Sequence, residues 1–251
     1  MRLRMLFAAL VVLLSALLLT LPLTASARPA TADHTVTLVN QSGQTLWIGT
    51  IVNADGSVNF TNLPTLADGQ SATVTIPEDQ SPNHWRGKFF ARQYCSGDSG
   101  STFNCLVGDC GADAGDCTTG QQPVSLAEFN FDQSDSLAPW YDVSYVDAFS
   151  LPITIQPDNA PPPPAGGGAC QEMGCPDDLL PYCPAADLTT NPGTGAPMLC
   201  VNPSRDEQTD YSKNLAAQCP YAYTWSKADT VPGNQVIREC QSCSGFTVTF
   251  H

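Results

Sequence analysis

Eleven cysteines constrain this chain more than any other feature of its sequence, and all of them lie between positions 95 and 243. In an exported chain, cysteines at this density indicate a disulfide framework. Zinc binding is the competing interpretation, because Cys240 and Cys243 have the C-x-x-C spacing of metal ligands. The sequence has no second C-x-x-C pair and no histidine pair at finger spacing, so disulfides are favoured and neither a metal nor another cofactor is expected. Because eleven is odd, at least one thiol is unpaired or pairs with another chain.

The first 27 residues are organised like a secretory signal peptide. Arg2 and Arg4 precede an almost unbroken apolar run over 6–23, and Ala-Ser-Ala at 25–27 forms a cleavage pattern before Arg28. The run approaches the length of a membrane span, but no charged stop-transfer segment follows it. We therefore interpret 1–27 as a removable signal and expect the mature chain to be secreted and extracellular.

The net charge of the mature chain excludes two classes of partner. Without residues 1–27, eight basic and 24 acidic residues remain, for a net charge of −16. A surface this acidic repels phosphate backbones and anionic lipid, so neither nucleic acid nor an anionic membrane is an expected partner. A neutral partner such as a glycan is compatible with the charge, which does not single one out.

Short alternating segments predict a mostly β fold. Each is rich in β-branched or aromatic residues and is bounded by turn-forming residues, as antiparallel strands are. Regular spacing of such strands indicates an antiparallel sandwich or barrel. Helical periodicity is scarce, and Asp210–Gln218 is the best candidate for a short helix. The predicted strands are 35–40, 45–49, 71–76, 88–92 and 246–250.

Composition divides the rest of the chain. We expect a sandwich core over 28–160, a Pro/Gly-rich connector at 161–168, and a disulfide-rich satellite at 169–218 with no clear strand pattern. Residues 219–251 should return to the sandwich and supply its last strand. Within the core, 96–124 reads as a loop stapled by cysteines. Sequons at Asn40 and Asn59 matter only in a source that glycosylates.

An ordered set of segments resembles the thaumatin-like proteins, the family that includes sweet thaumatin and pathogenesis-related plant proteins. The resemblance spans 35–251, and the ordered set is far more specific than any one segment. It implies the thaumatin type of antiparallel sandwich, with a small satellite of loops and a helix. The matching segments are VTLVN at 36–40 followed by Leu46-Trp47, GKFFAR at 87–92, GDCG at 108–111, SLAEF at 125–129, YDVSYVDAF at 141–149 and CPYAY at 219–223.

The resemblance, not the spacing of the cysteines, implies a set of five disulfides and leaves Cys243 as the odd thiol. The bridge that usually joins the first and last strands is missing, with Ser42 and His251 where its cysteines would be, and the satellite also lacks family bridges. The chain therefore resembles a reduced-cysteine member, expected to be a monomer. The implied pairs are Cys95–Cys105, Cys110–Cys117, Cys170–Cys240, Cys175–Cys219 and Cys183–Cys200.

The resemblance also implies an acidic cleft between sandwich and satellite. Glu128, Asp142 and Asp147 match three of its acids and are the candidate catalytic residues. The candidate substrate-binding residues are Lys88 at the family's basic position, Arg92 at its next arginine, and Asp229. The match at Asp229 is inexact, because the favoured position for the remaining acid is occupied by Ala228.

Independent chemistry supports this site only in part. Asp142 and Asp147 are five residues apart, so in a strand they start on opposite faces unless a bulge or turn intervenes. Both are equally compatible with anchoring turns. Glu128 interrupts an apolar segment, which favours a functional role. Lys88 beside the acids would favour their ionised forms.

We accordingly predict a secreted thaumatin-like protein that binds β-1,3-glucan or another cell-wall polysaccharide. Weak endo-β-1,3-glucanase activity with Glu128 and an aspartate as acid and base would be compatible with this site, as would an antifungal role in defence. The alternatives are a non-enzymatic defence or interaction protein, and a hydrolase inhibitor, each using the same acidic face on a protein partner.

Overall fold

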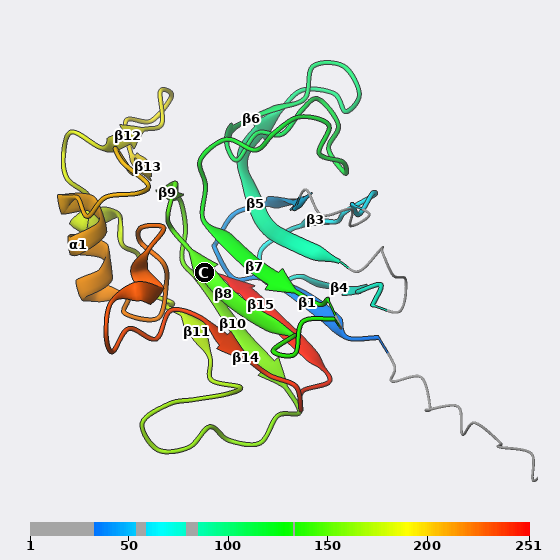
Figure 1. The fold of residues 1–251 in the computed structure, drawn as a ribbon. Helices are drawn as coiled ribbons and strands as arrows, with labels where there is room; N and C mark the ends of the chain where they lie inside the picture. The colour runs from blue at the N-terminus through cyan, green and yellow to red at the C-terminus, as the bar shows by residue number, and fades with distance from the viewer. Residues whose placement is uncertain (1–32, 54–58, 79–84, 133) are drawn as a thin grey trace, which may run out of the picture. The chain divides into compact units, whose positions relative to one another are not determined.

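The computed structural model describes residues 33–53, 59–78, 85–132 and 134–251, so the expected signal peptide lies outside the described residues. Two sheets provide the main architecture (Figure 1). The five-stranded sheet has the order β11 (Met173–Gly174), β10 (Ile153–Asp158), β15 (Gly245–Phe250), β1 (Thr35–Asn40) and β4 (Ser71–Thr75). The seven-stranded sheet contains β14 (Arg238–Glu239), β8 (Trp140–Ser144), β7 (Leu126–Asn130), β5 (Arg86–Ser96), β2 (Leu46–Val52) and β3 (Thr65–Leu66), with β6 (Asn104–Val107) paired to β5.

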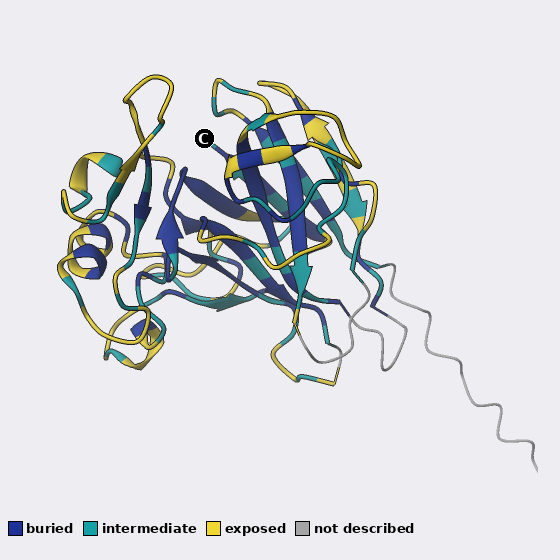
Figure 2. Ribbon diagram, turned by 90° about the horizontal axis from the view of Figure 1, so that it is seen from above, coloured by how far each residue is buried: buried dark blue, intermediate teal, exposed yellow. Residues whose placement is uncertain are grey.

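One buried core joins the two sheets. Alternate residues of each strand face this core. The rings of Phe129 and Tyr141 in the seven-stranded sheet pack on Phe246 of β15, with their centroids 5.3 Å and 4.8 Å, respectively, from the centroid of Phe246. Figure 2 shows the buried residues concentrated in these strands. The mostly β sandwich expected from the sequence is confirmed, and β15 returns beside β1 and β10.

The satellite contains more β structure than the sequence predicted. Strands β12 (Leu188–Thr190) and β13 (Pro197–Val201) form a hairpin that pairs with β9 (Ala148–Phe149), and β11 adds an edge to the five-stranded sheet. A satellite of loops and one helix at 169–218 was therefore a wrong prediction, because this segment also contains strands. These strands are only two to five residues long, too short to show an alternation.

The helical elements of the satellite side are short. Helix α1 spans Asp210–Gln218, the range predicted, and begins with a capping box in which Thr209 and Ser212 each accept a backbone N–H of the other. Tyr211 and Leu215 are the apolar side chains that α1 buries. Two 3₁₀ turns, η1 (Leu180–Tyr182) and η2 (Ala228–Thr230), complete the set. No helix among residues 33–53, 59–78, 85–132 and 134–251 has the length and apolarity to cross a bilayer.

Five disulfides staple the loops, and they join the same pairs that the family resemblance implies. Cys243 is buried and unpaired within the described chain. Where the usual terminal bridge is missing, the backbone N–H of His251 donates to the carbonyl of Pro152, and its Nε2 lies 2.9 Å from Thr154 Oγ1. Hydrogen bonds thus hold the C-terminal end.

Candidate functional site

Three charged side chains form one row across the outer face of the seven-stranded sheet. Lys88 of β5 is the direct partner of Glu128 in β7, and Glu128 is the direct partner of Asp142 in β8. Their neighbours Phe89, Phe129 and Val143 point into the core, so the pleat directs the row to the opposite face. Lys88 Nζ lies 3.8 Å from Glu128 Oε1.

A turn brings Asp147 to the same place, although its spacing from Asp142 in a continuous strand would put the two on opposite faces. Strand β8 ends at Ser144 and the chain bends at Val146 and Asp147 before β9 begins. Asn202 of the satellite fixes this bend: its amide Nδ2 donates to the carbonyl of Val146 at 2.8 Å, and its backbone N–H donates to that of Asp147 at 3.0 Å.

A polar cavity of about 290 Å³ lies over the row. Residues after the satellite close its far side, because Tyr223 pairs alongside Ser144 in an isolated parallel bridge. The cavity therefore lies between sandwich strands and the segment that follows α1. Its lining comprises Lys88, Leu126, Glu128, Asp142, Ser144, Val146, Asp147, Arg205, Tyr223 and Ser226.

Comparison with known proteins identifies the family of this chain. The sequence profile of the Thaumatin family matches residues 40–251. This chain belongs to the thaumatin family. It is 32% identical over 237 residues to pathogenesis-related thaumatin-like protein 3.5 of Cryptomeria japonica, covering 85% of this chain and 88% of that protein. Thaumatin-like protein 1 of Pyrus pyrifolia is 31% identical, with coverage of 77% and 82%. Among solved structures, the thaumatin-like xylanase inhibitor TLXI is similar with a TM-score of 0.48, 14% identity and coverage of 86% and 97%.

Electrostatics in this thaumatin-family cavity depend mainly on burial. Burial raises the pKa of the Glu128 carboxyl; Lys88 opposes the shift and Asp147 adds to it. Burial also raises the pKa of Asp142 well above its usual range, and the charge of Glu128 raises it further. Lys88 favours the ionised forms of both acids, as expected, but desolvation outweighs this one partly exposed ammonium group.

Asp142 is the most unusual group of the site. It is only 4% exposed, and its Oδ1 has no hydrogen-bond partner among the residues described here. A buried carboxylate oxygen without a donor is costly, by about 1–3 kcal/mol, unless the group is protonated or a ligand supplies the donor. Glu128 is half-buried beside it and Asp147 is also partly exposed in the cavity, so these two are the acids that a ligand can reach.

Asp229 lies at the border of the site. It is exposed in η2 and does not line the cavity, but its charge contributes to the raised pKa of Asp142. An electrostatic role fits this position, and direct substrate binding remains a prediction.

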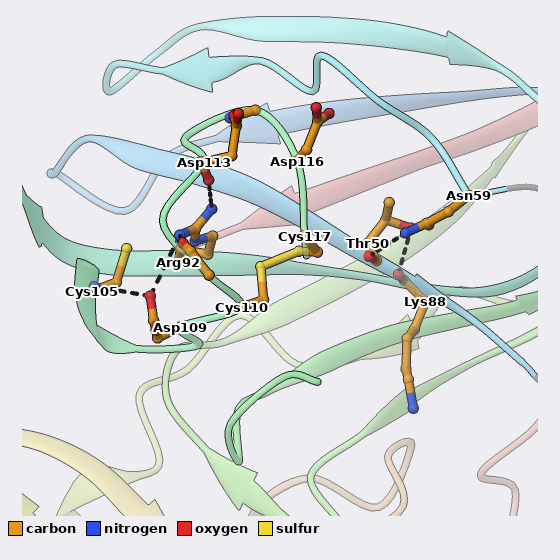
Figure 3. Close-up of a disulfide and its surroundings, with 12 residues drawn as sticks. Thr50, Asn59, Lys88, Arg92, Cys105, Asp109, Cys110, Asp113, Asp116 and Cys117 are labelled. Carbon is orange, nitrogen blue, oxygen red and sulfur yellow. Dashed lines mark hydrogen bonds and ion pairs between the residues drawn. A yellow bond between two sulfur atoms is a disulfide. The ribbon is translucent and has the colours of Figure 1, made fainter. Parts of the chain in front are cut away.

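Arg92 lies elsewhere, fully buried under the cysteine-stapled loop (Figure 3). Its guanidinium donates to the carbonyls of Asp113 at 2.6 Å and Gly111 at 2.7 Å, and it lies 3.4 Å from Asp109 Oδ1. The amine of Lys88 points away from this loop in Figure 3. The structure therefore does not bring Arg92 to the cavity but places it as the anchor of the loop.

Sequence reasoning missed several lining residues, of which Arg205 and Tyr223 carry the most chemistry. Arg205 adds a second cation to the cavity and, like Lys88, opposes the burial that raises the pKa of Glu128. Tyr223 lies within the CPYAY segment already singled out, so its motif was a usable signal. Arg205 stands in a loop with no pattern, and only the fold reveals its position.

Proposed function

We propose that this thaumatin-family protein is secreted and binds β-1,3-glucan, or a closely related neutral cell-wall polysaccharide, in the acidic cavity. The observation that supports this most is the row of Lys88, Glu128 and Asp142, with the unpartnered Oδ1 of Asp142 at its base. Sugar hydroxyls can donate to carboxylates and accept from an ammonium group, so a glycan can bind the partly exposed Lys88 and Glu128, with the buried Asp142 next to them. Five disulfides suit an oxidising extracellular environment.

The charges of the lining favour a neutral glycan over an anionic one. Glu128, Asp142 and Asp147 outnumber the two cations Lys88 and Arg205, and the remainder of the chain is strongly acidic. The negative potential of this surface would repel phosphate or uronate groups. Binding to glucan in fungal walls would give the protein a defensive, antifungal role.

Weak endo-hydrolysis is the second part of the proposal. Glu128 and Asp147 both line the cavity, and the charge of Asp147 contributes to the raised pKa of Glu128, so the two carboxyls share one space as an acid and base of a glycosidase do. Glu128, with its raised pKa, would donate a proton to the glycosidic oxygen as the C–O bond breaks. Water would attack the anomeric carbon and pass its proton to Asp147.

Sedimentation with insoluble β-1,3-glucan tests the binding. The wild type should leave the supernatant, and Glu128→Gln should bind about tenfold to a hundredfold more weakly, the loss expected for a charged hydrogen bond. Glu172→Gln is the matched control, because Glu172 is exposed and lies outside the cavity. A wild type that stays in the supernatant, or a Glu128→Gln variant that binds like the wild type, would contradict the proposal.

Soluble reducing ends released from the same suspension test hydrolysis separately. The wild type should release oligosaccharides slowly, and Asp147→Asn should release far fewer while still sedimenting with the glucan. Binding without release by the wild type would refute hydrolysis and retain the binding function. Full release by Glu128→Gln would remove Glu128 from the acid role.

A further inference from the structure

A second cavity, of about 280 Å³, lies away from the acidic one and shares none of its lining residues. Its walls come from the end of β5, from the satellite around η1, and from the C-terminal residue. Met198 and Leu180 supply apolar surface, whereas Gln93, Asp178 and His251 supply polar groups. Met198 belongs to a small apolar cluster with Leu126, and Leu126 lines the acidic cavity, so this cluster lies between the two cavities.

Tyr94 lines this cavity in a conformation that tyrosine rarely adopts. Its φ is 54°, in the left-handed region that glycine occupies far more readily, and 40% of its surface is exposed. The residue stands where β5 leaves its pairing with β2 and continues only with β6. Strained residues of this kind concentrate at ligand-binding positions, and an exposed aromatic ring at a cavity is a stacking surface.

Gln93, the preceding residue, has an unsatisfied amide. The side chain is 1% exposed, its Oε1 accepts from Gln44 Nε2 at 3.0 Å, and its Nε2 finds no acceptor within the described part of the chain. Exchanging oxygen and nitrogen in both glutamines would leave Gln93 Oε1 without a donor instead. Either assignment leaves one end of the amide without a protein partner beside a cavity, which is where a ligand oxygen or hydroxyl can supply one.

The charges around the cavity favour a neutral ligand. Asp178 is exposed at its wall and already accepts the backbone N–H of Leu180 through Oδ1. Burial lowers the pKa of His251, so its ring is uncharged at neutral pH and acts as a hydrogen-bonding group. Gln44 and Gln93 are uncharged donors and acceptors. An anion would face Asp178 without a cation to balance it among the residues that line this cavity.

We propose that this cavity is a second binding site, for a neutral saccharide of one or two rings that stacks on Tyr94 and hydrogen-bonds to Gln93. A pyranose ring has an apolar face of C–H groups and a polar edge of hydroxyls, which suits a lining that combines apolar side chains with the amides of Gln44 and Gln93. The volume is just below the range for drug-sized ligands and suits one or two sugar rings. The site is independent of the acidic cavity and of the function proposed for it.

Titration of ¹⁵N-labelled protein with laminaribiose, followed by two-dimensional NMR, tests the second site. The side-chain amide of Gln93 and the backbone of Tyr94 should shift with increasing sugar. Tyr94→Gly should weaken this response by about tenfold or more, because the stacking surface is lost. Tyr221→Ala is the matched control, since Tyr221 is another exposed tyrosine and does not line the cavity.

Two further measurements keep the outcomes distinct. Glu128→Gln should leave the shifts at Gln93 unchanged, so failure of the acidic site and failure of this one are separable. Tyr94→Gly should unfold at the same temperature as the wild type or a higher one, because glycine accepts the left-handed backbone. The proposal is overturned if the Gln93 signals do not shift with laminaribiose or if Tyr94→Gly responds like the wild type. It is also overturned if Tyr94→Gly lowers the unfolding temperature, because the ring would then serve packing and not ligand binding.

Discussion

Replacing Asp142 by asparagine should stabilise the protein at neutral and alkaline pH. The wild-type carboxyl is buried, lacks a donor to Oδ1 among the described residues, and stands directly opposite Glu128. Asparagine has nearly the same shape, carries no charge, and can donate its amide to the Glu128 carboxylate. The substitution therefore removes a repulsion and fills an empty hydrogen-bonding position at once.

The magnitude follows from the geometry of the row. Two unit charges about 5 Å apart repel by about 3 kcal/mol at an effective dielectric constant of 20. A buried oxygen without a donor costs about 1–3 kcal/mol, and the half-exposed Glu128 and nearby Lys88 weaken the repulsion. We expect a gain in the free energy of unfolding of about 1–3 kcal/mol at pH 8.

The pH dependence has a defined sign. Burial, Glu128 and Asp229 raise the pKa of Asp142 in the folded state, with Lys88 opposing them, so the folded protein binds this proton more tightly than the unfolded chain does. Wild-type stability from this group is thus present below the unfolded pKa of about 3.9 and is lost as pH rises through the folded pKa. The advantage of Asp142→Asn should be near zero at pH 4 and grow toward pH 8.

Guanidinium unfolding at pH 4, 6 and 8, with the disulfides oxidised, measures this difference. Asp177→Asn is the control, because Asp177 is exposed and stands outside the cavity, and its effect should be small at all three values. Destabilisation by Asp142→Asn, or an advantage that does not change with pH, would refute the argument that the ionised Asp142 carboxylate is repelled by Glu128 and lacks a donor among the described residues.

Three other predictions concern groups away from the cavity. Burial lowers the pKa of His34, but hydrogen bonds to Cys243 and Glu78 outweigh this and raise the pKa to about 10. In thermal unfolding, the stability advantage of the wild type over His34→Gln should be full below about pH 6.5 and fall toward pH 10. A stability difference that does not change with pH would contradict the ion pair between His34 and Glu78. Arg92→Met should lower the free energy of unfolding by about 2–4 kcal/mol, measured with denaturant, because two backbone carbonyls lose their donor. Glucan binding should not change. Weakened glucan binding at normal stability would show that Arg92 belongs to the binding site. Cys243 should resist a thiol reagent in the native state and react as one thiol per unfolded chain, whereas rapid native reaction would show an accessible thiol.

The sequence predicted those parts of the fold that depend on local pattern. Alternation placed β1 at Thr35–Asn40, and the predicted helix Asp210–Gln218 has the observed bounds because Thr209 caps it. The strands β12 and β13 were missed because two of their threonines are exposed and the hairpin is too short to alternate visibly.

The site depends on tertiary packing to a greater extent. Nothing in the spacing of Asp142 and Asp147 indicates that a bend held by Asn202 brings them to one cavity. Lys88 and Arg92 share one strand face and cannot be told apart by spacing. The loop over 96–124 buries Arg92, which becomes a structural anchor, whereas Lys88 stays open to the cavity.

The most direct measurement of the proposed site is a pH titration of the side-chain carboxyl carbons of Glu128 and Asp142 by NMR, with and without a soluble β-1,3-gluco-oligosaccharide. Sugar hydroxyls that donate to the Glu128 carboxylate stabilise its charged form, whereas Asp142 is already buried, so the titration midpoint of the pair should move downward and the carbon shifts should change. Saturation of the protein with the sugar while both carboxyls titrate unchanged would contradict glucan binding at this site.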